Sequence, residues 1–167
     1  MSNNFFISTS NRIRSTPFSS RNELAGVKNY TVYNNTLLPT IFKSLIDDYY
    51  HLIENVQLWD VCCQKIIEVK GRKSLSLMQY LFCRDFSNSS SGKVYYAPIV
   101  NFEGGLLNDP VVFCIDDDHF LISISDSDLF NWISAINHTK EFYSLTYLLS
   151  ASITSPVFGH VLNFSLE

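Results

Sequence analysis

The sequence predicts an α+β fold in which helices pack on one mostly antiparallel sheet. Apolar residues recur at helical spacing in some segments and alternate or run together in others, giving the order helix, strand, helix, three strands, helix. The three successive strands are joined by short turns, and short turns connect antiparallel neighbours. A hydrophobic content of 46% and an aromatic content of 14% supply enough apolar side chains for a core.

The 167 residues suit one domain, and the amino-acid composition differs at each end of the chain. Residues 1–22 are polar and rich in Ser and Asn, which predicts a flexible arm. Residues 23–138 carry the predicted elements and form the domain. Residues 139–167 form a divergent tail with few charges, which is either a hydrophobic strand pair or a sequence not selected to fold.

The first elements are a short strand that ends near Tyr33 and a helix that runs from a Thr36 cap to about Glu54. Pro39 falls in the first turn of that helix, where its missing N–H costs least. The apolar positions follow the spacing of one helix face: Leu38, Ile41, Phe42, Leu45, Ile46, Tyr49, Leu52 and Ile53.

A strand over residues 66–69 ends at Gly71, and a helix over residues 73–83 follows it. A strand over residues 94–100 then leads into a turn at Gly104 and Gly105. Glycine allows the backbone conformations of a tight turn, so this stretch predicts a hairpin with a returning strand over residues 111–115.

Three acidic residues, 116–118, mark a tight turn into a strand over residues 120–125. They suggest Ca²⁺, but the spacing and the glycine of an EF-hand are absent, which favours a solvated turn. Asp126 is a predicted N-cap for the last helix. Its apolar face consists of Leu129, Phe130, Trp132, Ile133 and Ile136.

Charge and composition exclude several classes of function. The net charge of −4 and the pI of about 5.5 give no attraction to nucleic acid or to an anionic membrane. No apolar run approaches the roughly 20 residues of a membrane span. We therefore expect a cytoplasmic protein without nucleic-acid or membrane partners. The four cysteines form no CxxC pair, which predicts free thiols and no metal site.

The hairpin also carries the candidate catalytic residue, Asp109, at the start of the returning strand. Rigid neighbours on a hairpin fix the direction of a carboxylate, which is one way to build a site. An ordinary polar hairpin edge explains the same ten residues, and the pattern alone favours that interpretation.

Nine segments in order resemble one known family, over roughly residues 12–137. They are Arg14-Ser15-Thr16-Pro17-Phe18, Ala25-Gly26-Val27-Lys28 with Tyr30-Thr31-Val32-Tyr33-Asn34, Leu37-Leu38-Pro39, Asp48-Tyr49-Tyr50-His51-Leu52, Val56-Gln57-Leu58-Trp59-Asp60-Val61, Arg84-Asp85, Tyr95-Tyr96-Ala97-Pro98, Gly104-Gly105-Leu106-Leu107-Asn108-Asp109-Pro110 and Ser123-Ile124-Ser125-Asp126-Ser127-Asp128. The set resembles the folate-binding aminomethyltransferase family, which includes the glycine cleavage T-protein. The Trp59-Asp60 pair and the hairpin sequence resemble its dimethylsulfoniopropionate demethylase branch most.

The resemblance implies tetrahydrofolate as the acceptor of a one-carbon unit, at N5 or N10, and a small methyl or aminomethyl donor. It assigns Asp109 as the carboxylate that faces the pterin and the reacting carbon. The cofactor-binding residues it implies are Tyr95, Tyr96, Asn108, Asp109 and Ser125. Of the two tyrosines on one strand, one should face the core and the other the folate cleft, unless both are ordinary core or surface aromatics. Ser125 stands near a position where the T-protein has Asn, which argues against a glycine-cleavage role. Trp59 is either a substrate-binding aromatic or a core side chain.

Family members are more than twice this length, and the resemblance stops after Ile136, as expected for truncation or a shifted reading frame. We therefore expect an N-terminal fragment of a tetrahydrofolate-dependent methyl- or aminomethyltransferase, weakly active or inactive alone and prone to self-association through exposed core. The alternatives are a non-catalytic folate-binding or interaction module and a stand-alone α+β domain without a folate role.

Overall fold

A computed structural model of the chain describes residues 10–142 and 145–150. The chain divides after Cys63 into two compact units, which are described separately. The predicted arm at residues 1–22 and tail at residues 139–167 lie partly outside the described residues, and those boundaries stay a prediction.

The first unit contains helix α1 (Ser19–Leu24), the hairpin β1 (Asn29–Tyr33) and β2 (Thr36–Ile41), and helix α2 (Leu45–Glu54). Neither α1 nor β2 was predicted, and the predicted helix that starts at Thr36 is wrong. Asn34 and Asn35 have φ of 50° and 58°, which builds a two-residue hairpin turn and pairs Tyr33 with Thr36. Helix α2 begins later, where the Ser44 side chain accepts a hydrogen bond from the Asp47 N–H.

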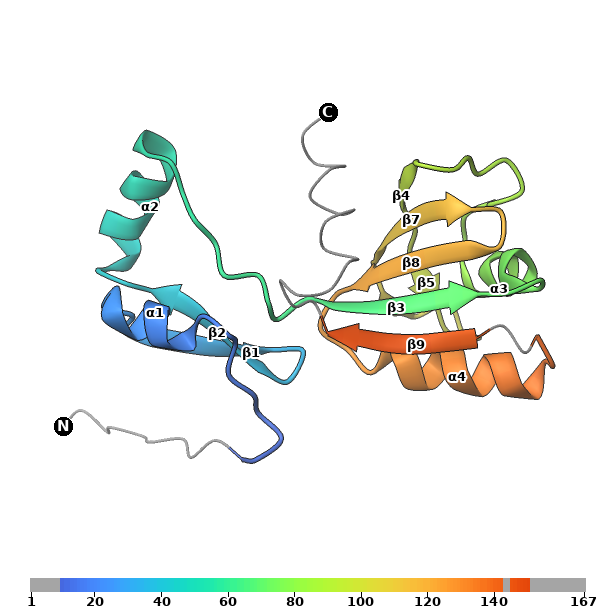
Figure 1. The fold of residues 1–167 in the computed structure, drawn as a ribbon, viewed down its shortest axis with the longest axis horizontal. Coiled ribbons are helices and arrows are strands. Elements are labelled where there is room, and N and C mark those ends of the chain that lie inside the picture. The colour runs from blue at the N-terminus through green and yellow to red at the C-terminus, as the bar shows by residue number, and fades with distance from the viewer. Residues whose placement is uncertain (1–9, 143–144, 151–167) are drawn as a thin grey trace. The chain divides into compact units, whose positions relative to one another are not determined.

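The second unit is built on a five-stranded antiparallel sheet in the order β4-β7-β8-β3-β9 (Figure 1). The strands are β4 (Val94–Tyr96), β7 (Val111–Asp116), β8 (His119–Ile124), β3 (Lys65–Lys70) and β9 (Leu145–Ser150). Strand β9 pairs with β3, so residues 145–150 of the predicted tail belong to the sheet; the rest of the tail beyond them lies outside the described residues.

Helices α3 (Ser74–Leu81) and α4 (Leu129–Thr139) share one hydrophobic core with one face of this sheet. Ile67, Phe120 and Ile122 of the sheet are fully buried there, together with Leu77 of α3 and Ile133 of α4. This arrangement confirms the predicted α+β class, because the sheet is antiparallel and the helices pack on it. The predicted cap is wrong: α4 starts after Asp128, and the Leu129 N–H donates to the Ser127 hydroxyl.

A small hairpin of β5 (Ile99–Val100) and β6 (Leu106–Asn108) stands beside the main sheet. The predicted strand over residues 94–100 is therefore two strands, since Pro98 has no N–H to donate and interrupts the ladder. Asn101 closes the turn of the small hairpin by accepting from the N–H groups of Glu103 and Gly105 at 3.1 and 2.7 Å. Gly104 has a φ of +85°, which explains the glycine at that position.

Candidate functional site

Asp109 lies at the junction of the small hairpin and the main sheet. It follows β6 and precedes β7, and its side chain is exposed. The backbone on both sides is fixed, because Asn108 pairs with Ile99 and the Pro110 carbonyl accepts from the Ala97 N–H at 3.1 Å. Pro110 also restricts Asp109 to extended backbone conformations. The sequence thus places this carboxylate on a rigid support.

Ser125 comes to Asp109 through the register of the sheet. Strands β7 and β8 pair Val111 with Ser123, and continuing this register by two residues brings Asp109 opposite Ser125. The Ser125 hydroxyl donates to Oδ1 of Asp109 at 2.6 Å. A short hydrogen bond to a carboxylate is charge-assisted, so it holds the carboxylate in one orientation.

Asn108 is a buried polar side chain that ties three segments together. Its Oδ1 accepts from the Ser125 N–H at 3.1 Å, and its Nδ2 donates to the Ser125 carbonyl at 3.1 Å. The same Nδ2 donates to the Ser127 hydroxyl at 2.8 Å. The end of β6, the end of β8 and the start of α4 are therefore joined by one amide that is 4% exposed.

The structure brings together three of the residues expected at the site: Asn108, Asp109 and Ser125. Ser127 belongs to the same cluster and was missed by the sequence analysis. The available signal was its spacing, since Ser125 and Ser127 are two residues apart directly after a strand.

The two tyrosines of β4 face different surroundings, as their alternation along the strand predicts. Tyr95 packs against the core, with its ring centroid 5.8 Å from that of Phe86 and the Arg84 guanidinium 4.8 Å from its own centroid. Its hydroxyl accepts from the Ser90 N–H at 3.1 Å. Tyr96 is 59% exposed. A cofactor-binding role for either tyrosine stays a prediction.

Trp59 belongs to the first unit, where it is 65% exposed and is no core side chain. Its neighbour Asp60 is fixed by hydrogen bonds from Thr16 and Asn22. This network orders the backbone beside Trp59. Its predicted contact with the donor remains a prediction.

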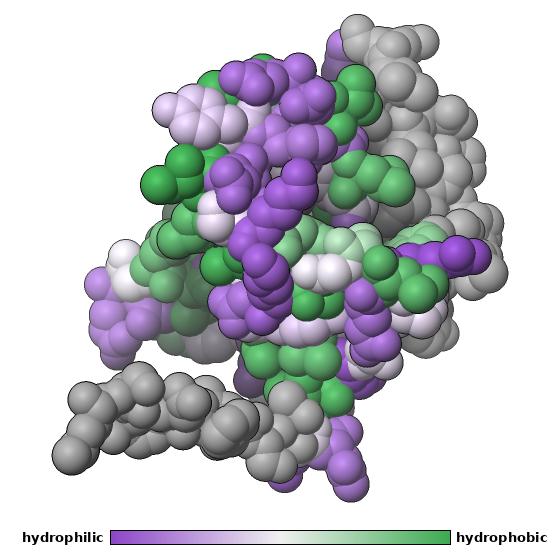
Figure 2. Space-filling model, turned by 90° about the vertical axis from the view of Figure 1, so that its left-hand side faces the viewer, coloured by the Kyte–Doolittle hydropathy of each residue, from purple (hydrophilic) through white to green (hydrophobic). Residues whose placement is uncertain are grey.

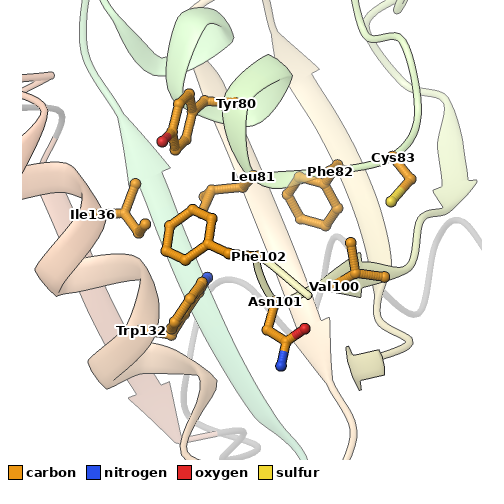
Figure 3. A pocket seen from close by; sticks show the side chains of 9 residues that line it. All are labelled: Tyr80, Leu81, Phe82, Cys83, Val100, Asn101, Phe102, Trp132 and Ile136. Carbon is orange, nitrogen blue, oxygen red and sulfur yellow. The ribbon is translucent and has the colours of Figure 1, made fainter. Parts of the chain in front are cut away.

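A pocket of about 300 Å³ opens elsewhere in the second unit, between the small hairpin, the end of α3 and α4 (Figure 3). The Phe102 ring points from the hairpin toward Trp132, with ring centroids 5.2 Å apart. The lining consists of Tyr80, Leu81, Phe82, Cys83, Val100, Asn101, Phe102, Trp132 and Ile136. None of the predicted site residues is among them, and the Asn101 amide already bonds within its own turn.

The described residues contain no metal-ligand cluster, no membrane-spanning helix and no disulfide. Within residues 10–142, no group of three or more His, Cys, Asp or Glu side chains is placed to hold a metal ion. None of the described helices has both the length and the apolar character that crossing a membrane requires. All four cysteines are free; Cys62, Cys63 and Cys114 are buried and Cys83 is exposed.

Comparisons with known proteins point to one family. The family model described as the GCVT N-terminal domain matches residues 18–155. Dimethylsulfoniopropionate demethylase DmdA of Ruegeria pomeroyi is 48% identical over 120 residues, which are 72% of this chain and 33% of that protein. The chain thus spans about a third of the length of that relative.

A solved structure has the same fold. The glycine cleavage system aminomethyltransferase T from Bartonella henselae superposes with a TM-score of 0.68 at 16% sequence identity. The match covers 83% of this chain and 38% of that chain.

Proposed function

Since this chain belongs to the GCVT N-terminal domain family, we propose that it forms the Asp109-bearing part of a tetrahydrofolate-dependent methyl- or aminomethyltransferase. The observation that carries the proposal is the exposed Asp109 carboxylate, held in one orientation by the Ser125 hydroxyl at 2.6 Å. The 48% identity with a dimethylsulfoniopropionate demethylase supports a small zwitterionic methyl donor.

The residues present fit a reduced folate. A reduced pteridine carries N–H donors, and Asp109 offers a carboxylate oxygen, Oδ2, to which none of residues 10–142 donates a hydrogen bond. Tetrahydrofolate, when bound, supplies the nitrogen that accepts the one-carbon unit. Asp109 orients that group and stabilises positive charge near the transferred carbon. It needs no nucleophilic role, because a sulfonium methyl group is already electrophilic and positioning does most of the work.

Binding of tetrahydrofolate to this chain tests the proposal. We expect weak but measurable affinity by anaerobic titration calorimetry, because part of the enclosing site is absent, and about tenfold weaker binding in Asp109→Asn, which removes the charge and keeps the shape. Asp117→Asn is the matched control, because Asp117 is an exposed carboxylate in the turn between β7 and β8. Equal affinity of the three proteins, or no affinity of the wild type, would contradict the proposal.

An alternative is a non-catalytic folate-binding or interaction module. The observation that favours it is the apolar surface of the first unit: α2 has no buried residue, and Leu45, Ile46 and Ile53 are each more than half exposed. Figure 2 shows hydrophobic residues exposed among hydrophilic ones on the face that it draws. Apolar patches of this kind mark association surfaces, so self-association remains a prediction. Sedimentation of the wild type and of Ile46→Ser at several concentrations tests it.

We propose that this chain supplies only part of the site for the complete reaction. This chain would hold one side of the folate through Asp109, and a binding site that encloses the ligand would need further polypeptide, since enclosure supplies most small-ligand affinity. Turnover by this chain alone is therefore not expected. The cytoplasmic location and the absence of nucleic-acid and membrane partners stay predictions from the sequence.

A further inference from the structure

The Ser125 hydroxyl has its one donor hydrogen committed to Asp109. It donates to Oδ1 at 2.6 Å, and a serine hydroxyl carries only one O–H. A cofactor at this site would therefore meet Ser125 without a free donor. The oxygen of Asp109 that remains open toward a ligand is Oδ2, to which no residue in 10–142 donates a hydrogen bond.

Both ends of the contact between Ser125 and Asp109 are fixed by the same neighbour. Asn108 precedes Asp109 in the chain, and its amide bonds both the N–H and the carbonyl of Ser125, each at 3.1 Å. These two hydrogen bonds restrain the backbone of Ser125 relative to Asn108. The Ser125 backbone is thus held beside Asp109 before any ligand arrives, which is a condition for a preorganised site.

We propose that Ser125 is a positioning residue that acts through Asp109, and not a cofactor-binding residue as the family resemblance implies. This inference rests on the proposed function of Asp109. The hydroxyl holds Oδ1 so that the carboxylate keeps one orientation and presents Oδ2, which accepts no hydrogen bond from residues 10–142, to its ligand. The site then suits a group with one N–H or one positive centre, such as a ring nitrogen of a reduced pteridine.

The orientation of Asp109 can be measured without any ligand. Three-bond ¹⁵N–¹³Cγ and ¹³C′–¹³Cγ couplings report the χ1 angle of Asp109 in solution. We expect one χ1 rotamer in the wild type and rotamer averaging in Ser125→Ala. Ser125→Thr, which keeps the hydroxyl, should restore the single rotamer. Ser123→Ala, which removes the hydroxyl two residues earlier on β8, is the matched control and should leave the couplings unchanged. A single rotamer in Ser125→Ala would overturn the proposal.

A thermodynamic cycle with tetrahydrofolate then separates positioning from direct binding. We expect Ser125→Ala to weaken binding about three- to tenfold in the wild type, as for the loss of one hydrogen bond. In the Asp109→Asn background the same change should alter affinity less than about twofold, because residues that act through one another are not additive. Equal weakening in both backgrounds would show direct contact with the cofactor and overturn the inference. A wild type without affinity would count against the proposed function, while the coupling measurement would still decide the role of Ser125.

Discussion

Replacing Asn108 by Ala should destabilise the second unit more than any other single polar change at the site. The change removes three hydrogen bonds, of 3.1, 3.1 and 2.8 Å, from a side chain that is 4% exposed. It leaves the N–H and the carbonyl of Ser125 without their partner. Because a buried hydrogen bond contributes about 0.5–1.5 kcal/mol net, we expect a loss of about 2–4 kcal/mol in the free energy of unfolding.

Thermal unfolding followed by circular dichroism measures this loss. For a chain of this size, about 2–4 kcal/mol corresponds to a decrease in Tm of roughly 5–15 °C. Asn88→Ala is the matched control, because the Asn88 side chain is exposed and its one hydrogen bond, to the Ser87 hydroxyl, is 3.4 Å long. We expect a change below about 0.5 kcal/mol for this control.

Equal stability of Asn108→Ala and Asn88→Ala would refute this role of Asn108. The buried amide would then not hold β6, β8 and the start of α4 together, and the orientation of Asp109 would need another explanation. Asn108→Asp adds a second check. It keeps an acceptor for the Ser125 N–H but loses the two Nδ2 donations, so it should also be destabilised.

Three further predictions concern the thiols, the acid response and the hairpin. Burial, followed by the charge of Asp60, raises the pKa of the Cys62 thiol to about 11, so iodoacetamide at pH 8 should label the exposed Cys83 first, as mass spectrometry of timed samples would show; faster labelling of Cys62 would contradict this. The backbone N–H of Ser87, and then the Gln79 amide, hold the pKa of Asp85 down at about 2, compared with 3.8 ordinarily. The resulting stabilisation is present above about pH 4 and is lost as the pH falls toward 2, so Asp85→Asn should show a smaller fall in Tm across this window than the wild type, and an equal fall would exclude the effect. Gly104→Ala should cost about 1–2 kcal/mol in urea unfolding because its φ is +85° although no atom crowds a new Cβ, whereas Gly104→Asn should cost less, and an unchanged Gly104→Ala would show that the turn relaxes.

The second unit was largely predictable from its sequence. The strands at β3, β7 and β8 and the helices α3 and α4 follow patterns of apolar residues that the core then buries. The first unit was not, because an apolar spacing that fits one helix face also fits a strand followed by a helix. The Asn34-Asn35 turn decides between them, and its signal is a preference for positive φ that apolar periodicity does not contain.

The site was predictable only in part, for a related reason. The turn glycines of the hairpin and the acid after it mark Asp109 in the sequence. The partnership of Asp109 with Ser125 depends on the register between β7 and β8, which a single sequence does not reveal. The function of Asn108 was hidden as well, since its amide bonds the backbone of a segment 17 residues away.

A crystal structure of this chain with tetrahydrofolate would test the role of Asp109 most directly. We predict a pteridine N–H within about 3 Å of Oδ2 of Asp109, with the Ser125 hydroxyl still on Oδ1. A pteridine ring bound in the pocket between Phe102 and Trp132, with Asp109 free of the ligand, would contradict a folate-binding role of Asp109.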